Sequence, residues 1–178
     1  PVVSITATDP AAVEGTTNST IVFTVAQSNP STLDTSIIVT LDLGTVEAAD
    51  ITSITYVDAS GATVTTTVAA LQAGLALTIP ATPSGSAPWS PVFTITATQD
   101  TIYEVSEALT MNLALAPGET DAILGTAVAT GTIYDEDSTA PTAKIDAPLG
   151  TNPTDKLGDQ PVVSITATDP AAVEGTTN

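Results

Sequence analysis

The chain contains no cysteine and no histidine, and only two of its 178 residues are basic. These absences exclude disulfide bonds, zinc sites built from Cys and His, and acid–base catalysis by a histidine. The two lysines, Lys144 and Lys156, are outnumbered by 20 acidic residues, which gives a net charge of −18. Such a chain can neutralise almost no phosphates, so we expect no nucleic-acid partner. No apolar run approaches the ~20 residues of a membrane span, so we also predict no direct membrane insertion.

Aromatic residues are scarce as well, at 3%, yet 42% of the residues are hydrophobic and the mean hydropathy is +0.30. An acidic tail without a core would contain far fewer apolar residues. The apolar residues are mainly Ala, Val, Ile and Leu, and threonine is abundant. Because β-branched residues suit half-buried strands better than helices, this composition favours an all-β fold.

The hydrophobic pattern has the period of strands. In residues 2–8, apolar Val3 and Ile5 alternate with polar Ser4 and Thr6, which predicts a strand with one buried face. Comparable runs between Gly, Pro and Asp turns predict strands at residues 20–27, 35–42, 51–57, 63–69, 71–80, 91–98, 108–115 and 123–134. A short helical turn at residues 68–73 is an alternative for part of this pattern. The sequence therefore predicts a two-sheet antiparallel β-sandwich with an immunoglobulin-like Greek key.

An internal repeat defines the domain organisation. Residues 161–178 are identical to residues 1–18, so the pattern repeats with a period of 160 residues. A period of this length indicates separate domains in tandem, each with its own core. We assign residues 1–137 to one sandwich, residues 138–160 to a linker, and residues 161–178 to the start of the next repeat. The expected partners are identical neighbouring repeats, the fragment itself should be monomeric, and residues 161–178 should either be disordered or add to a sheet edge.

Acidic residues gather in four places that strand counting could bring to one end of a sandwich. These are Glu14, Asp50, Asp100 with Glu104, and the run at residues 135–137. Calcium takes six to eight oxygen ligands from carboxylates, carbonyls and water, and a divalent ion would relieve the repulsion among them. The alternative is that these acids are solvated loop residues. Glu107 is interpreted as a surface residue.

The order of short motifs adds a family resemblance. The chain reads Ala-Val-Glu-Gly at residues 12–15, Phe-Thr-Val at residues 23–25, a Gly-Thr loop ending at Asp50, Asp-x-x-x-Glu at residues 100–104, and Gly-Thr-Ile-Tyr-Asp-Glu-Asp at residues 131–137. This order resembles the Calx-β domain, a calcium-binding sandwich found in sodium/calcium exchangers and, in tandem, in giant bacterial adhesins of the RTX type. The resemblance implies Ca²⁺ ligands at Glu14, Asp50, Asp100, Glu104, Asp135 and Asp137, a backbone donor at the Ile102 carbonyl, and Glu136 as an additional candidate.

Repeat and resemblance together predict a structural role with no catalytic residues. The hypothesis is an extender repeat, stiffened by Ca²⁺ at the domain end and linker, in an adhesin at the bacterial cell surface that serves adhesion and biofilm formation. The alternative is a carbohydrate- or ice-binding module, for which Trp89 and the Thr-x-Thr runs are the candidate features. Paired acids also hydrolyse glycosides in some enzymes, but the sequence predicts that this protein is not an enzyme.

Overall fold

A computed structural model describes residues 1–100 and 104–135, and the fold within them is built almost entirely from short strands. The elements are β1 (Val2–Asp9), β2 (Ala11–Val13), β3 (Thr20–Gln27), β4 (Thr35–Asp42), η1 (Ala48–Asp50, a 3-10 turn), β5 (Ile51–Val57), β6 (Thr63–Thr66), α1 (Val68–Ala73), β7 (Leu75–Ile79), β8 (Val92–Ala97), β9 (Glu107–Leu115), β10 (Ile123–Leu124) and β11 (Val128–Tyr134). The predicted linker at residues 138–160 and the second copy at residues 161–178 lie outside the described residues.

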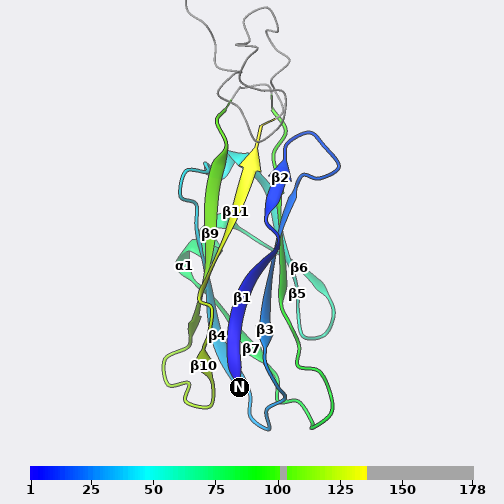
Figure 1. The fold of residues 1–178 in the computed structure, drawn as a ribbon, viewed down its shortest axis with the longest axis vertical. Helices are drawn as coiled ribbons and strands as arrows, with labels where there is room; N and C mark the ends of the chain where they lie inside the picture. Colours follow the sequence, from blue (N-terminus) through cyan, green and yellow to red (C-terminus); the bar gives the residue numbers. More distant parts are fainter. Residues whose placement is uncertain (101–103, 136–178) are drawn as a thin grey trace, which may run out of the picture.

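The strands form two sheets that enclose one core (Figure 1). The first sheet has the order β10-β1-β3-β8-β5-β6, and the second has the order β2-β11-β9-β4-β7. Every pairing is antiparallel except β1 with β10 and β2 with β11, which are parallel and lie at one edge of each sheet. The predicted two-sheet sandwich is confirmed, with these two parallel edge pairs as a refinement.

The first strand changes sheets at Pro10. Strand β1 pairs with β3 in the first sheet, and its register shifts between Ala7 and Asp9. Proline has no N–H to donate to a ladder, so the pairing ends there and the chain can cross to the other sheet. The Pro10 carbonyl then accepts a hydrogen bond from the N–H of Thr132 at 2.8 Å, and β2 continues beside β11. This crossing carries Glu14 to the end of β11.

The run at residues 123–134, predicted as one strand, is two strands in different sheets. Residues 125–127 make the crossing. Gly125 donates to the carbonyl of Val3 at 2.8 Å, whereas the Ala127 carbonyl accepts from Leu113 of the second sheet at 2.7 Å. The uninterrupted strand prediction was wrong because periodicity gives the face of each residue but does not reveal which sheet it joins.

The segment between β6 and β7 contains a helix where the sequence favoured continuous strands. The short helical alternative at residues 68–73 is the one observed. Thr67 caps α1, because its hydroxyl accepts a hydrogen bond from the Ala70 N–H at 3.1 Å. Gly74, with φ of +95°, follows the last turn in a conformation that residues with a side chain rarely adopt. The helix joins the edge of the first sheet to the edge of the second.

The inward-facing residues predicted from alternation form most of the core. The most deeply buried large side chains are Phe23, Phe93, Ile5, Ile21, Ile37, Leu41, Ile54, Leu71, Ile79, Ile95, Leu109 and Met111. The two sheets approach closely at Gly131 of β11, where an added Cβ would lie 2.6 Å from Cγ2 of Ile21. A larger residue at this position would overpack the core. Trp89 also packs against this core.

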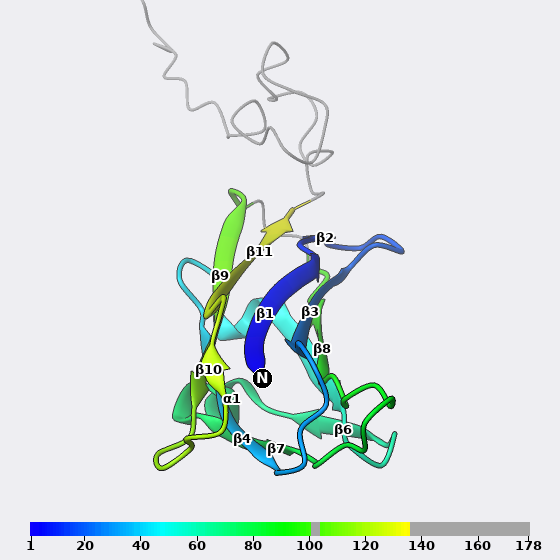
Figure 2. The ribbon, with the colours of Figure 1, turned by 60° about the horizontal axis from the view of Figure 1, so that its bottom comes forward.

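The sandwich is elongated, with the start of β1 at one end of its long axis and the finish of β11 at the other (Figure 1). Figure 2 shows the two sheets from a direction closer to the strand axis. We call the end where β1 begins beside β10 the entry end, and the end where β11 finishes at Asp135 the exit end. None of the helices in the described part of the chain is long enough to cross a bilayer.

Candidate metal centre

Separate parts of the chain bring carboxylates together at the exit end. Glu14 follows β2, and its N–H donates to the carbonyl of Tyr134 at 3.0 Å, which holds it beside the end of β11. Asp135 comes directly after β11, and its Oδ2 accepts a hydrogen bond from the N–H of Glu104 at 2.7 Å. Backbone contacts therefore place residues from the first, middle and last parts of the domain side by side. We call Glu14, Asp50, Asp100, Glu104, Glu107 and Asp135 the carboxylate cluster.

Asp50 reaches the carboxylate cluster from η1. Its Oδ2 accepts a hydrogen bond from the Glu47 N–H at 2.6 Å, and the Asp50 N–H donates to the Glu47 carbonyl at 3.2 Å in return. The Asp50 carbonyl accepts from the N–H of Thr98 at 2.8 Å, and the Thr98 hydroxyl donates to the Ala49 carbonyl at 2.7 Å. This short turn is consequently tied to the end of β8, and the position of Asp50 is defined from both sides.

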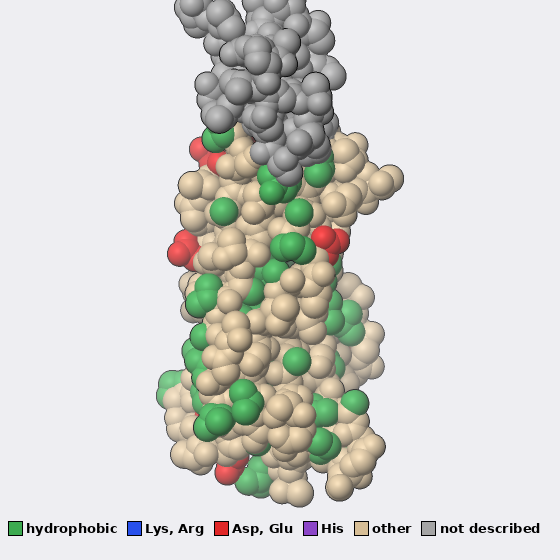
Figure 3. All heavy atoms as spheres, viewed as in Figure 1, with side chains coloured by type: hydrophobic (Ala, Val, Ile, Leu, Met, Phe, Trp, Pro, Cys, Tyr) green, Lys and Arg blue, Asp and Glu red, His purple; other side chains and the backbone are tan. Residues whose placement is uncertain are grey.

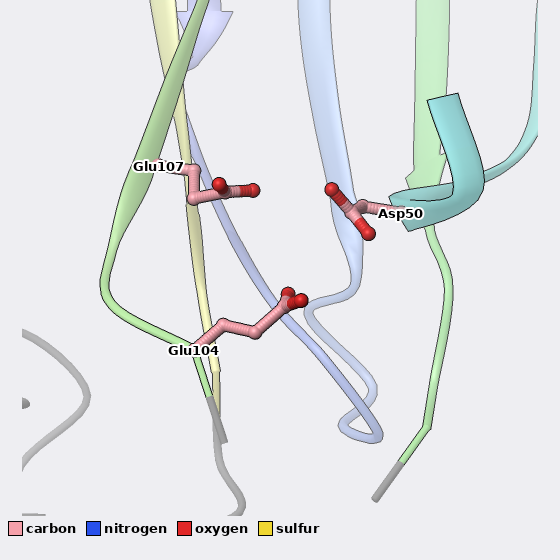
Figure 4. A group of neighbouring side chains, drawn as sticks. All are labelled: Asp50, Glu104 and Glu107. Atoms are coloured by element: carbon pink, nitrogen blue, oxygen red, sulfur yellow. The ribbon is translucent and has the colours of Figure 1, made fainter. Parts of the chain in front are cut away.

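Glu107 is the residue that the sequence interpretation missed. One carboxylate oxygen from each of Asp50, Glu104 and Glu107 lies within 4.8 Å of the other two, and Figure 4 shows the three side chains pointing toward one another. Glu107 begins β9 and is only half exposed. The sequence did carry the signal, because Glu107 continues the period-two series of the buried Leu109 and Met111 and so lies on the inner face.

Burial makes the carboxylate cluster electrostatically unfavourable without a cation. Glu14, Asp50 and Asp135 are only 4%, 6% and 2% exposed. Burial and the nearby carboxylates of Asp135, Asp100, Glu104 and Asp50 raise the pKa of Glu14 to about 8. The Glu14 side chain is therefore a largely buried carboxylate surrounded by other acids.

Two other members of the carboxylate cluster, Glu107 and Glu104, also have raised pKa values. Burial, a hydrogen bond shared with Asp50 and the charges of Asp50, Glu104 and Glu47 raise the pKa of Glu107 to about 7. Burial raises the pKa of Glu104, and the charges of Asp50, Asp100, Asp135 and Glu47 add to the effect. Three carboxyl groups are thus biased toward their protonated forms, because repulsion and desolvation both oppose their ionisation.

No basic side chain of the described residues offsets this charge, since residues 1–135 contain no Lys, Arg or His. On the face shown in Figure 3 the acidic side chains are few and widely separated. Its donors are all oxygen atoms, which hard divalent cations such as Ca²⁺ and Mg²⁺ prefer. The residues present therefore fit a metal ion, which would supply the missing positive charge.

The residues proposed from the sequence divide into two groups. Glu14, Asp50, Asp100, Glu104 and Asp135 are brought together, as their mutual electrostatic effects on Glu14 show. The Ile102 carbonyl, Glu136 and Asp137 lie outside the described residues. The predicted convergence of separate acidic segments is thus observed for the described members, whereas metal ligation by them stays a prediction.

No family model matches the chain, and no curated protein matches it. Solved structures with a similar fold include CBD12 from CALX1.2, at 17% identity and a TM-score of 0.48. The match covers 75% of this chain and 44% of the CBD12 chain. The apo form of the Calx CBD1 domain matches at 16% identity and a TM-score of 0.45, covering 76% of this chain and 98% of its own. The calcium-binding domain CBD12 of CALX1.1 matches at 16% identity and a TM-score of 0.48, covering 75% and 46%.

This chain therefore spans less than half the length of the two CBD12 structures and nearly the whole of the single CBD1 domain. The sheets define the sandwich independently of these likenesses, and the carboxylate cluster is defined by its own distances and burial.

Proposed function

We propose that this chain is a calcium-binding extender repeat, a non-catalytic spacer that Ca²⁺ stiffens at its exit end. Glu14, Asp50, Asp100, Glu104, Glu107 and Asp135 would hold the ion or ions. The observation that carries the proposal is the convergence of largely buried carboxylates, with Glu14 surrounded by other acids and with oxygens of Asp50, Glu104 and Glu107 within 4.8 Å of one another. Ca²⁺ is the preferred ion because it accepts many oxygen ligands in flexible geometry, whereas Mg²⁺ requires a near-ideal octahedron.

The position of the carboxylate cluster supports a mechanical role. It lies where β11 ends, and the sequence leads from there toward an identical repeat at residues 161–178. The entry and exit ends lie at opposite ends of the long axis (Figure 1), so repeats joined in series would extend as a rod. Calcium at the exit end would order the chain that leaves each domain.

The proposal extends to the parent protein and its location. Identical repeats suit a role in setting length, and the absence of cysteine suits an exported bacterial protein. We place the parent protein at the bacterial cell surface, as an adhesin of the RTX type that projects a distal binding domain. A carbohydrate- or ice-binding module has less support, because Trp89 packs against the core rather than offering an open sugar platform.

Calorimetric titration with Ca²⁺ and thermal melting test the proposal. A ligand that binds only the folded state stabilises it by about 2.7 kcal/mol at 100 times its Kd, which corresponds to a rise in Tm of about 10 °C. We expect heat of binding and this rise with Ca²⁺, and a smaller rise with Mg²⁺. Because screening alone stabilises a chain of charge −18, the reference sample contains chelator and NaCl at equal ionic strength.

Asp121→Asn is the matched control, because Asp121 is an exposed acid near β10 at the entry end. It should respond to Ca²⁺ as the parent does. The absence of binding heat, together with melting curves that coincide in chelator and in millimolar Ca²⁺, would refute the proposal.

A further inference from the structure

Residues 1–18 fill a well-defined place in the sandwich, which we call the first-strand slot. Strand β1 lies between β3 and β10 in the first sheet, and β2 lies beside β11 at the edge of the second. Val3, Ile5 and Ala12 are fully buried there. The segment therefore contributes to both sheets and to the core between them. Without it, both sheets would lack a strand and the core would be open to solvent.

The strand pairing and printed hydrogen bonds of this segment with the rest of the domain reach residues 22–28 and 123–134. Strand β1 also lies against β9, and β2 lies against β8. The N–H of Ile5 donates to the Thr126 carbonyl at 2.9 Å, and the carbonyl of Val2 accepts from Ser28 at 2.9 Å. In each of these hydrogen bonds, the group that pairs with the segment belongs to the rest of the domain, outside residues 1–18. A second peptide of the same sequence would find every one of them.

A further set of hydrogen bonds is internal to the segment. Asn18 closes its final turn: its carbonyl accepts from the Val13 N–H at 2.7 Å, and its side-chain amide donates to the Ala11 carbonyl at 3.3 Å. The Thr16 hydroxyl donates to the Val13 carbonyl at 2.9 Å. Residues 171–178 have the same amino acids as residues 11–18, so the second copy carries the side chains that these hydrogen bonds use.

The chain between the two copies is long enough to reach the slot. Residues 136–160 can span about 80 Å when extended, at ~3.3 Å per residue. The longest described strand, β9, has nine residues and covers only about 30 Å. Residue 161 can therefore be carried from the exit end back to the entry end, where β1 begins.

We propose that residues 161–178 can enter the first-strand slot in place of residues 1–18. The partner of this surface is thus the opening segment of the next repeat. Both copies make the same contacts, so the two arrangements differ only in connection: residues 1–18 are joined directly to β3, whereas residues 161–178 are held by the longer tether. In a tandem array, each sandwich could be completed by its own first strand or by that of the following repeat, which would join neighbouring domains mechanically.

The exchange leaves the carboxylate cluster complete, because Glu174 occupies the position in the second copy that Glu14 occupies in the first. The inference does not depend on the proposed calcium site, and its tests are made in chelator.

Disabling one copy at a time in the full 178-residue chain tests the exchange. Ile5→Asp places a charge at a fully buried site of the first copy, and Ile165→Asp makes the same change in the second. We expect Ile165→Asp to melt as the parent does. Ile5→Asp should remain folded, with Tm lowered by no more than about 10 °C, because the longer tether adds only a modest closure entropy. The double variant should be unfolded at 25 °C. If Ile5→Asp and the double variant have indistinguishable melting curves, the proposal is overturned.

Disulfide trapping supplies an independent measurement, since the chain has no cysteine of its own. Thr6 lies opposite Thr24 in the β1–β3 register, so Thr6→Cys with Thr24→Cys in the parent is the positive control. In the Ile5→Asp background, Thr24→Cys with Thr166→Cys should form an intramolecular disulfide to a similar extent.

The register control is Thr24→Cys with Ala167→Cys in the same Ile5→Asp background. Its second thiol points to the opposite face of the strand and should crosslink at least tenfold less. Equal disulfide yields at positions 166 and 167 would mean that the thiols meet without a fixed register. The absence of a disulfide at position 166 would mean that residues 161–178 do not enter the first-strand slot. Either result overturns the proposal.

Discussion

Replacing Glu14 by Gln should change stability in opposite directions with and without calcium. The structure buries this carboxyl group among other acids and raises its pKa from 4.5 to about 8. In the unfolded chain it titrates near its ordinary value. Between these two values the folded state binds more protons than the unfolded state, so the free energy of unfolding decreases as pH rises. The stabilising contribution of the proton is complete below pH 4.5 and is lost as pH approaches 8.

The magnitude follows from the size of the shift. Each pKa unit corresponds to about 1.4 kcal/mol, so keeping Glu14 in the folded, metal-free protein at pH 8 costs on the order of 4 kcal/mol. Gln has nearly the same shape and carries no charge, and it removes this cost. In chelator at pH 8 we expect Glu14→Gln to melt about 10 °C above the parent protein. At pH 5 the two should nearly coincide, because Glu14 is already largely protonated in the parent.

In saturating Ca²⁺ the order should reverse, since the variant lacks one ligand and gains less stability from the ion. Differential scanning calorimetry in chelator and in Ca²⁺, at pH 5 and pH 8, measures all four comparisons. Asp121→Asn controls for the change in net charge and should show neither the pH-dependent gain nor the reversal. A Glu14→Gln variant that melts below the parent in chelator at pH 8 would refute this reasoning.

Two further substitutions separate the metal site from the core. Glu107→Gln should weaken Ca²⁺ binding at least about tenfold by calorimetric titration and raise Tm in chelator at pH 8, because the pKa of Glu107 is also raised, to about 7; unchanged affinity would remove it from the site. Gly131→Ala should lower Tm by about 3–9 °C, since its Cβ would lie 2.6 Å from Ile21 Cγ2 and overpacking costs about 1–3 kcal/mol. Its Ca²⁺ affinity should match that of the parent, and a loss of affinity without a loss of stability would contradict this assignment.

Local patterns predicted much of the fold. Alternating apolar residues located β3, β4 and β5 to the residue, and the inward faces of Phe23, Ile37 and Ile95 are buried as expected. This works because the side chains of a strand have a period of two, which requires only neighbouring residues to be read. The same rule extends to Glu107 and would have placed it on the inner face.

The assembly of the carboxylate cluster depended on long-range arrangement. The sequence by itself determined that the chain forms strands, that its first 18 residues recur 160 positions later, and that acids stand at the ends of several strands. Only the tertiary structure decided that the chain changes sheets at Pro10 and again between β10 and β11, which sets Glu14 beside Asp135. Periodicity cannot reveal these crossings, because the face that a side chain takes is a local property, whereas the sheet that a strand joins depends on hydrogen bonds to residues more than a hundred positions away.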